Sequence, residues 1–270
     1  MKKKRWLIVL VAFALIIGMT LSFPFLRSLA VMSVYSAAEK RASVLEAEDI
    51  SISLPGGLST SEKDWYPFVI TFNADQFGAY VDRSVDLTIL YNFGAFDSAY
   101  GCSSFYDPSS DYHAAFYGAY VIKSHDGTVY GYTDSGELNI EEMATVFEYD
   151  MNVLVLKSLG SPSPSFDYRV TGNGTTTING YDFVVIDAQI LTQSPLHRVS
   201  DFQNAYYQYG SPKRLNTQKD FKNLAVCGRI YASELPERSV TLCFYIIAPN
   251  IKMIDACEKD MIQKAKIGQN

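Results

Sequence analysis

The sequence predicts an α+β fold in which one N-terminal transmembrane helix precedes a single domain with a mainly antiparallel sheet packed by helices. An uncharged run of 21 residues, from Trp6 to Leu26, would form roughly 31 Å of helix, which is enough to span a bilayer core. Behind it, apolar segments alternate with Gly, Asn, Asp and Pro turn residues, and a helical pattern closes the chain. The 270 residues are 48% hydrophobic and 19% charged, which suits one folded domain and an anchor.

The basic residues Lys2–Arg5 precede the apolar run, and positively charged flanks resist translocation. We therefore expect residues 1–27 to form a cytoplasmic tail and a transmembrane helix, with the lipid bilayer as the partner of residues 6–26. Residues 28–48 then form a juxtamembrane helix, and residues 49–270 form an α+β domain outside the cytoplasm, held at the cell membrane. The alternative is a cleaved signal peptide, whose apolar region is usually about 7–15 residues long.

The charge of the chain changes behind the apolar run. Residues 28–270 contain 18 basic and 29 acidic residues, a formal charge of −11. Such a surface repels nucleic acid, so we expect no nucleic-acid partner. Basic or neutral partners are compatible with this charge. The alternative is that the acidity only keeps an exposed domain soluble.

The sequence pattern predicts a series of strands in the first half of the domain. Ile50, Ile52 and Leu54 alternate with serines and end at a Pro-Gly-Gly turn, which is typical of a strand. Asp126-Gly127 has the composition of a two-residue hairpin turn between Val121-Ile122 and Val129-Tyr130. Further segments rich in β-branched and aromatic residues predict strands at 68–72, 85–96 and 114–123.

The second half carries stronger boundary signals. Asn139, with Glu142 three residues later, predicts the N-cap of a helix that continues to about Tyr149. Asn179-Gly180 predicts a tight hairpin turn. The flanking strands of that hairpin, the last two strands and a closing helix are expected, in this order, at 175–178, 181–191, 224–231, 240–247 and 251–267.

This order of elements resembles that of the PsbP-like α/β/α sandwich family. The resemblance covers residues 50–267: an opening strand that ends in Leu-Pro-Gly, a central helix, a strand that begins Ile-Asn-Gly-Tyr, two long strands and a C-terminal helix. It implies an antiparallel sheet between helices. It also implies a non-enzymatic accessory or binding role on an extracytoplasmic membrane face. The resemblance carries over no functional residue.

Few residues of the chain indicate catalytic chemistry. The histidines His113, His125 and His197 stand in different segments without the spacing of a metal site, and no nucleotide-binding loop is present, so we expect neither metal nor cofactor. In the loop 102–113, Asp111 and His113 lie near serines and a cysteine, which would suit a membrane-anchored cell-envelope hydrolase. Serine and aspartate are also what ordinary loops contain.

Aromatic residues suggest binding instead. Tyrosines offer flat apolar faces with a polar tip, which suit sugar rings and protein partners, although core packing explains them as well. We therefore expect a membrane-tethered, non-catalytic binding or accessory domain, with an envelope protein or a carbohydrate as its partner. The candidate binding residues are Tyr106, Asp111, His113, Tyr206, Tyr207 and Tyr209.

A disulfide between Cys227 and Cys243 follows from an expected register. If the last hairpin turns about Leu235, these two cysteines face each other with β-carbons about 4.5–5.5 Å apart, close to bonding geometry. The alternative is that both stay reduced. Cys257 is expected to be a buried free thiol on the closing helix, and Cys102 a free thiol in its loop.

Overall fold

The computed structural model describes residues 2–22, 34–55, 68–91, 111, 115–157, 161–194 and 221–268. Residues 34–41 form a helix without a label. The labelled elements are α1 Lys2–Ser22, α3 Val44–Ala47, β1 Ser51–Ser53, β2 Phe68–Phe72, the π-helix η1 Ala74–Gly78, α4 Ala79–Val81, β3 Val85–Tyr91, β4 Phe116–Ser124, α6 Ile140–Glu148, the π-helix η2 Tyr149–Lys157, β5 Phe166–Ile178, β6 Tyr181–Gln193, β7 Asn223–Leu235, the 3₁₀ turn η4 Pro236–Arg238, β8 Val240–Ala248, α7 Ile251–Asp260, the 3₁₀ turn η5 Ile262–Lys264 and β9 Lys266–Gly268.

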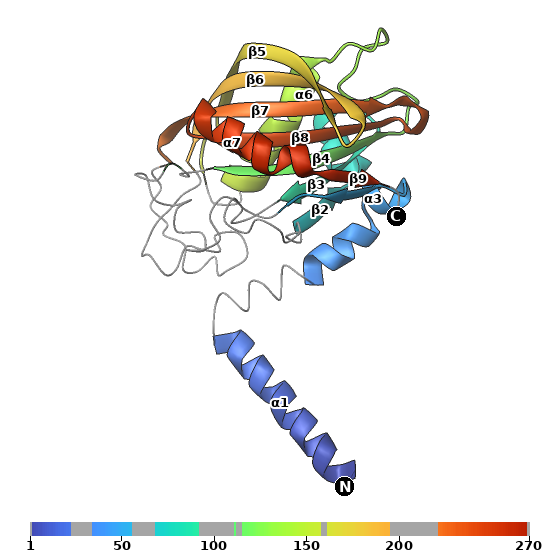
Figure 1. Ribbon diagram of the computed structural model, residues 1–270, viewed down its shortest axis with the longest axis vertical. Helices are drawn as coiled ribbons and strands as arrows, with labels where there is room; N and C mark the ends of the chain where they lie inside the picture. Colours follow the sequence, from blue (N-terminus) through green and yellow to red (C-terminus); the bar gives the residue numbers. More distant parts are fainter. Residues whose placement is uncertain are drawn as a thin grey trace.

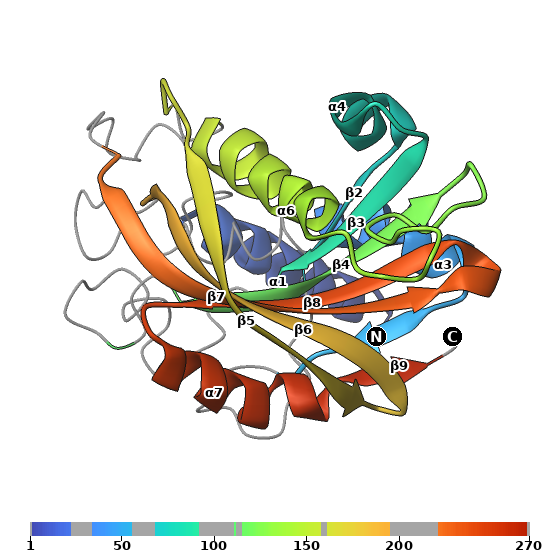
Figure 2. The same cartoon turned by 90° about the horizontal axis from the view of Figure 1, so that it is seen from above.

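Seven strands form one antiparallel sheet in the order β2-β3-β4-β8-β7-β6-β5, and Figure 1 shows them one below another, with β5 at the top and β2 at the bottom. A second sheet pairs β1 with β9, which brings the start and the end of the domain together. The large sheet lies between helices: α6 covers one face and α7 the other (Figure 2). Its central strand β8 is buried along its whole length because both faces are covered.

Two hydrophobic cores follow from the alternation of side chains along the strands. On β8, Leu242 and Phe244 belong to the core beneath α7, whereas Cys243 and Tyr245 belong to the core beneath α6. The α7 side also takes in residues of α3, β1 and β9, and the α6 side takes in residues of η1. The sheet therefore separates two apolar layers.

An arginine joins α7 to the sheet. Arg229 on β7 binds both carboxylate oxygens of Asp187 on β6, at 2.6 and 3.1 Å. Its remaining nitrogen binds Asp255 at 3.0 Å and Glu258 at 2.5 Å on α7. The planar guanidinium suits this arrangement because it can bind several carboxylates at once. The position of α7 is thus set by charge as well as by apolar packing.

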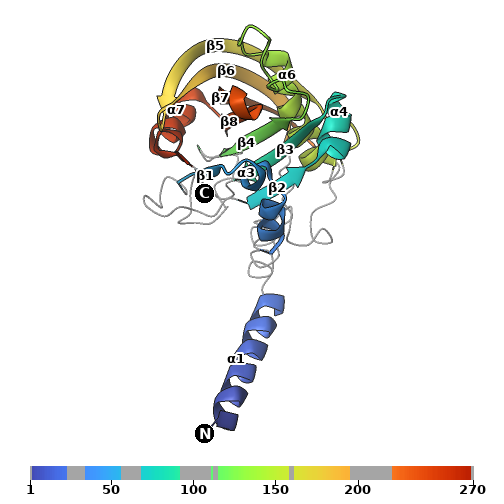
Figure 3. The ribbon, with the colours of Figure 1, turned by 90° about the vertical axis from the view of Figure 1, so that its right-hand side faces the viewer.

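The two edges of the sheet differ. At the β2 edge, the helix at 34–41 bonds the strand backbone: the Val69 amide donates to Ser36 Oγ and the Thr71 amide to Glu39 Oε2, both at 2.9 Å. The opposite edge is β5, the outermost strand, which curves together with β6 (Figure 3). Unpaired edges invite further strand pairing, and here one of the two is covered by a helix.

The turn and cap predictions of the second half are confirmed. Asn179 and Gly180 adopt φ of 50° and 84° between β5 and β6, where Ile178 pairs with Tyr181. Asn139 caps α6, and its side chain accepts from the Glu142 amide. These features depend on neighbouring residues alone, which is why their local sequence signals hold.

Two other predictions about local structure are wrong. Asp126-Gly127 is a turn but closes no hairpin, because β4 pairs with β3 on one side and β8 on the other, which leaves no place for a strand after the turn. The closing helix ends at Asp260 rather than Ile267; η5 follows, and β9 then pairs with β1.

The predicted fold class, with its N-terminal transmembrane helix, is also wrong. Within the part of the chain that the structure describes, no helix is long and apolar enough to cross a membrane. The helix α1 begins at Lys2 and ends at Ser22, so its uncharged part from Trp6 is 17 residues, or about 25 Å, against a bilayer core of about 30 Å. Helix α1 projects away from the domain (Figure 1). The bilayer contact of residues 6–26 and the location outside the cytoplasm stay untested predictions.

Candidate ligand-binding groove

The described residues enclose an apolar groove between α6 and the strands β5 to β8. It holds about 450 Å³ of space, including its open mouth. Figure 2 shows α6 lying across these strands on the face opposite α7. The lining is contributed by one helix and four strands: Ile140, Ala144, Phe147, Phe166, Tyr168, Val170, Ile186, Ala188, Ile190, Gly228, Ile230, Ile246 and Ile247.

The strand alternation builds the floor of the groove. Alternate residues of β5, β6 and β7 point to the α6 side, so apolar residues two apart gather there while Asp187 and Arg229 point to the α7 side. Gly228 lies within this floor. A β-carbon at Gly228 would lie 2.6 Å from Ile190 Cδ1, so a side chain here would displace Ile190. The glycine thus lets Ile190 pack directly against the β7 backbone.

Exposure changes across the groove. Ile186 and Ile190 on β6 and Phe147 on α6 are buried, whereas Tyr168 and Val170 on β5 are each 38% exposed. The β6 and α6 side of the groove is therefore shielded from solvent, and the groove opens at the β5 edge of the sheet. An apolar group that enters from this side would be removed from water, which is the main favourable contribution to apolar binding.

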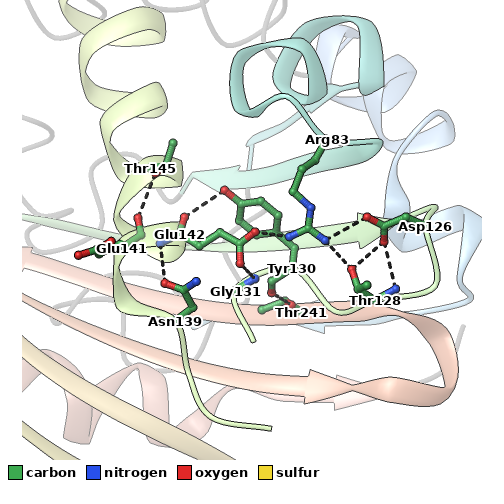
Figure 4. A network of polar contacts seen from close by, with 10 residues as sticks. All are labelled: Arg83, Asp126, Thr128, Tyr130, Gly131, Asn139, Glu141, Glu142, Thr145 and Thr241. Atoms are coloured by element: carbon green, nitrogen blue, oxygen red, sulfur yellow. Dashed lines mark hydrogen bonds and ion pairs between the residues drawn. The ribbon is translucent and has the colours of Figure 1, made fainter. Parts of the chain in front are cut away.

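A polar network holds the N-terminal end of α6, the helix that forms one wall (Figure 4). Beyond the Asn139 cap, the carboxylate of Glu142 accepts from the Gly131 amide at 2.9 Å and pairs with Arg83. The Tyr130 hydroxyl donates to the Glu142 carbonyl at 3.0 Å. The first turn of α6 is thus bound to the loop before it and to the segment that precedes β3.

Arg83 extends the network to the loop that follows β4. Its guanidinium also pairs with Asp126 at 3.1 Å, donates to Thr128 and lies 5.4 Å from the Tyr130 ring centre (Figure 4). Hydrogen bonds from the Thr128 hydroxyl and amide, together with Arg83, lower the pKa of Asp126 to about 2. Asp126 therefore stays ionised at neutral pH, and Arg83 joins two acidic groups from separate segments.

A buried carboxyl group holds the other end of α6. Asp150, in the first turn of η2, is 5% exposed and accepts hydrogen bonds from Tyr91 on β3 and, at 2.7 Å, from Tyr120 on β4. Burial raises the pKa of Asp150 to about 6, against the opposing effect of the two hydroxyl donors. Buried carboxyl groups are costly unless they are bonded, and both oxygens are bonded here.

Aromatic contacts link this carboxyl group to the groove wall. The Tyr120 ring stacks on Tyr245 at 4.6 Å, and Phe147 packs edge-on against both rings at 5.0 and 5.7 Å. Phe147 is itself part of the groove lining. The backbone changes from α-helix to π-helix directly after Glu148, a feature often found near functional sites. The wall is therefore anchored at both ends.

The groove has an apolar surface. Among its lining residues, Tyr168 at the mouth is the one with an ionisable side chain. Within the described ranges, no group of three or more His, Cys, Asp or Glu side chains is arranged to hold a metal ion. The groove is thus a concave apolar surface.

Of the six residues predicted from the sequence to bind, the structure describes Asp111, which is not part of the groove lining. Asp111 is an exposed turn residue. Tyr106, His113, Tyr206, Tyr207 and Tyr209 fall outside the described residues, as does Cys102, so the binding role of these tyrosines and the hydrolase alternative stay untested predictions.

The predicted disulfide is wrong. Cys227, Cys243 and Cys257 are free thiols. The last hairpin turns at η4, so that Leu235 pairs with Val240 and Cys243 pairs with Ala232 rather than Cys227. The register thus differs by five residues, about 16 Å along a strand, and an odd offset places the two thiols on opposite faces. The prediction that Cys257 is a buried free thiol is confirmed.

The sequence reasoning missed the groove, although part of its signal was present. Phe166, Tyr168 and Val170 alternate with Asp167 and Arg169, a pattern typical of a strand with one apolar face. The pattern does not show which element lies opposite the apolar face of β5, because α6 lies close to β5 only in the folded chain.

The chain was compared with protein family models, curated proteins and solved structures, and none of them matches it. The resemblance to PsbP-like proteins therefore stays a prediction.

Proposed function

We propose that this domain is a non-catalytic binding domain that holds an apolar small molecule in the groove between α6 and β5 to β8. One observation carries the proposal: the surface of the groove is apolar, and partly exposed residues lie at its mouth. Isolated surface apolar residues need no explanation, but a concave surface built from five elements does.

The anchoring of α6 supports the same proposal. A wall that is fixed at one end by Glu142 and Arg83 and at the other by Asp150 loses little conformational freedom when a ligand binds. Because the surface that faces the groove is apolar, a matching ligand presents a hydrocarbon or aromatic body to it and keeps any polar group at the mouth, where Tyr168 lies. An aliphatic chain or a fused ring system meets this description.

A fluorescent probe tests the proposal directly. Anilinonaphthalene sulfonate combines an aromatic body with one charged group and becomes bright in apolar surroundings. In the variant Ala144→Trp, the indole projects from α6 into the groove, so we expect the affinity for the probe to fall about tenfold or more. Ala37→Trp is the matched control, since Ala37 is exposed on the helix at 34–41, outside the groove.

The outcomes separate clearly. Loss of probe binding in Ala144→Trp, with normal binding in Ala37→Trp, supports the groove as the binding site. Equal binding by both variants and the unaltered protein would place the probe elsewhere and contradict the proposal. Circular dichroism spectra of the three proteins check that the fold is retained.

A further inference from the structure

We propose that β5 pairs with β5 of a second copy of this chain, antiparallel and centred on Tyr168, so that two sheets join into one. The strand lies at the edge of the large sheet with β6 as its neighbour (Figure 1). Among the residues that the structure describes, no backbone group bonds the outer edge of β5. This proposal does not depend on the ligand of the groove.

The difference between the two edges of the sheet supports the proposal that another strand pairs with β5. At β2, side chains of the helix at 34–41 satisfy strand amides through Ser36 and Glu39. Natural sheets protect their edges by such covers, by charges or by bulges. On β5 a bulge at Thr171, between Val170 and Gly172, limits the regular edge but leaves the segment Phe166–Val170 in continuous register with β6. That segment is the part of the edge able to pair.

Charge complementarity identifies a second copy as the occupant. In an antiparallel pair centred on Tyr168, Asp167 of one copy lies opposite Arg169 of the other, and the twofold axis repeats this pair. Both side chains are exposed, and neither forms an ion pair with another described residue; Arg169 donates to Gln189 Oε1 at 3.2 Å on its own sheet. A pairing centred one residue to either side would break this match.

The apolar face agrees with the same register. Residues directly opposite each other point to the same face, so the two Tyr168 rings meet and Phe166 of each copy meets Val170 of the other. Tyr168 and Val170 are each 38% exposed in the single chain and would be covered by the pairing. Because these residues line the groove, the second copy would contribute side chains to its open mouth.

The segment beyond the bulge is a poorer site. Residues 172–177 include two glycines and three threonines, and glycine weakens strand pairing because it contributes no side chain contact. A basic or acidic peptide from another protein would match only one of the two charges on Phe166–Val170. When two copies of Phe166–Val170 run antiparallel, Asp167 of each lies opposite Arg169 of the other, which favours pairing between two copies of this chain.

Charge reversal tests the pairing by sedimentation velocity. Asp167→Arg and Arg169→Asp each place two like-charged pairs in the interface, so we expect each to raise the dimer dissociation constant about tenfold or more. An equimolar mixture of the two variants restores both opposite pairs across a mixed dimer. It should therefore recover the affinity that either variant alone has lost, which a folding defect would not do.

Lys252→Asp is the matched control for Arg169→Asp, because it makes the same change of charge at an exposed position on α7 rather than on β5. We expect it to leave the dissociation constant unchanged. A protein that stays monomeric at every accessible concentration would overturn the proposal. So would reversals without effect, or a mixture of the two variants that fails to recover the dimer.

Discussion

The buried carboxyl group at the end of α6 yields a quantitative prediction. Asp150 is bonded by the hydroxyls of Tyr91 and Tyr120 and has almost no contact with water. Burial raises its pKa from 3.8 to about 6 in the folded protein. Replacing it by asparagine keeps the shape of the side chain and removes its ability to ionise.

The sign of the effect follows from proton binding. Because the pKa of Asp150 is higher in the folded state, folding favours the protonated form, and the stability that this contributes is present in full below about pH 4. It is lost as the pH rises through about 6. The rise from 3.8 to about 6 corresponds to about 3 kcal/mol of unfolding free energy. We expect Asp150→Asn to escape this loss.

Urea unfolding of the unaltered protein and of Asp150→Asn, from about pH 4 to about pH 7.5, measures the difference in unfolding free energy between the two. That difference should move by about 3 kcal/mol in favour of the variant as the pH rises. Other titrating groups are present in both proteins, so their contributions cancel to first order.

Asp126→Asn serves as the control. The pKa of Asp126 is lowered to about 2 by hydrogen bonds from Thr128 and by Arg83, so its contribution is present above its unfolded pKa and lost only at lower pH. The difference between this variant and the unaltered protein should be nearly flat above about pH 5. A flat difference for Asp150→Asn as well would refute the reasoning, because Asp150 would then titrate alike in both states.

Three further predictions concern stability and thiol chemistry. Arg229→Lys cannot bind both oxygens of Asp187 and should lower the unfolding free energy by about 1–3 kcal/mol in urea unfolding; an unchanged midpoint would show that the ion pairs contribute little. Gly131→Ala places a β-carbon at a φ of 79° and 2.4 Å from Met143 Sδ, so thermal unfolding should show an unfolding free energy lower by roughly 1–3 kcal/mol. An unchanged unfolding free energy would contradict the positive φ of Gly131 and its close approach to Met143. Native alkylation followed by peptide mapping should modify Cys227 ahead of the two buried thiols at 243 and 257, and protection of Cys227 until reduction would revive the disulfide.

Local signals in the sequence were reliable where the structure depends on neighbouring residues. Asn179-Gly180 forms its turn because both residues tolerate positive φ, and Asn139 caps α6 because its side chain reaches an amide three residues away. The same kind of signal failed at Asp126-Gly127, where the turn formed but both edges of β4 were already paired. A turn signal alone therefore says nothing about which strand follows.

Register was the first property that only the tertiary structure decided. Cys227 and Cys243 stand on neighbouring strands, as expected, but the turn lies at Pro236–Arg238, and this shift separates the thiols and places them on opposite faces. A shift of a few residues changes every pair along a hairpin. Turn residues near Leu235 allow several such registers, and packing of both faces selects one.

The sequence by itself determined the alternating strands, the Asn139 cap, the tight turn at Asn179 and the burial of Cys257, because each rests on residues close together in the chain or on one apolar face. The tertiary structure decided the groove, the burial of Asp150 between Tyr91 and Tyr120, and the position of β5 at the edge of the large sheet. These depend on contacts between segments far apart in the chain. Periodicity shows that a face is apolar, but it does not show which element covers that face or how much of it is left open.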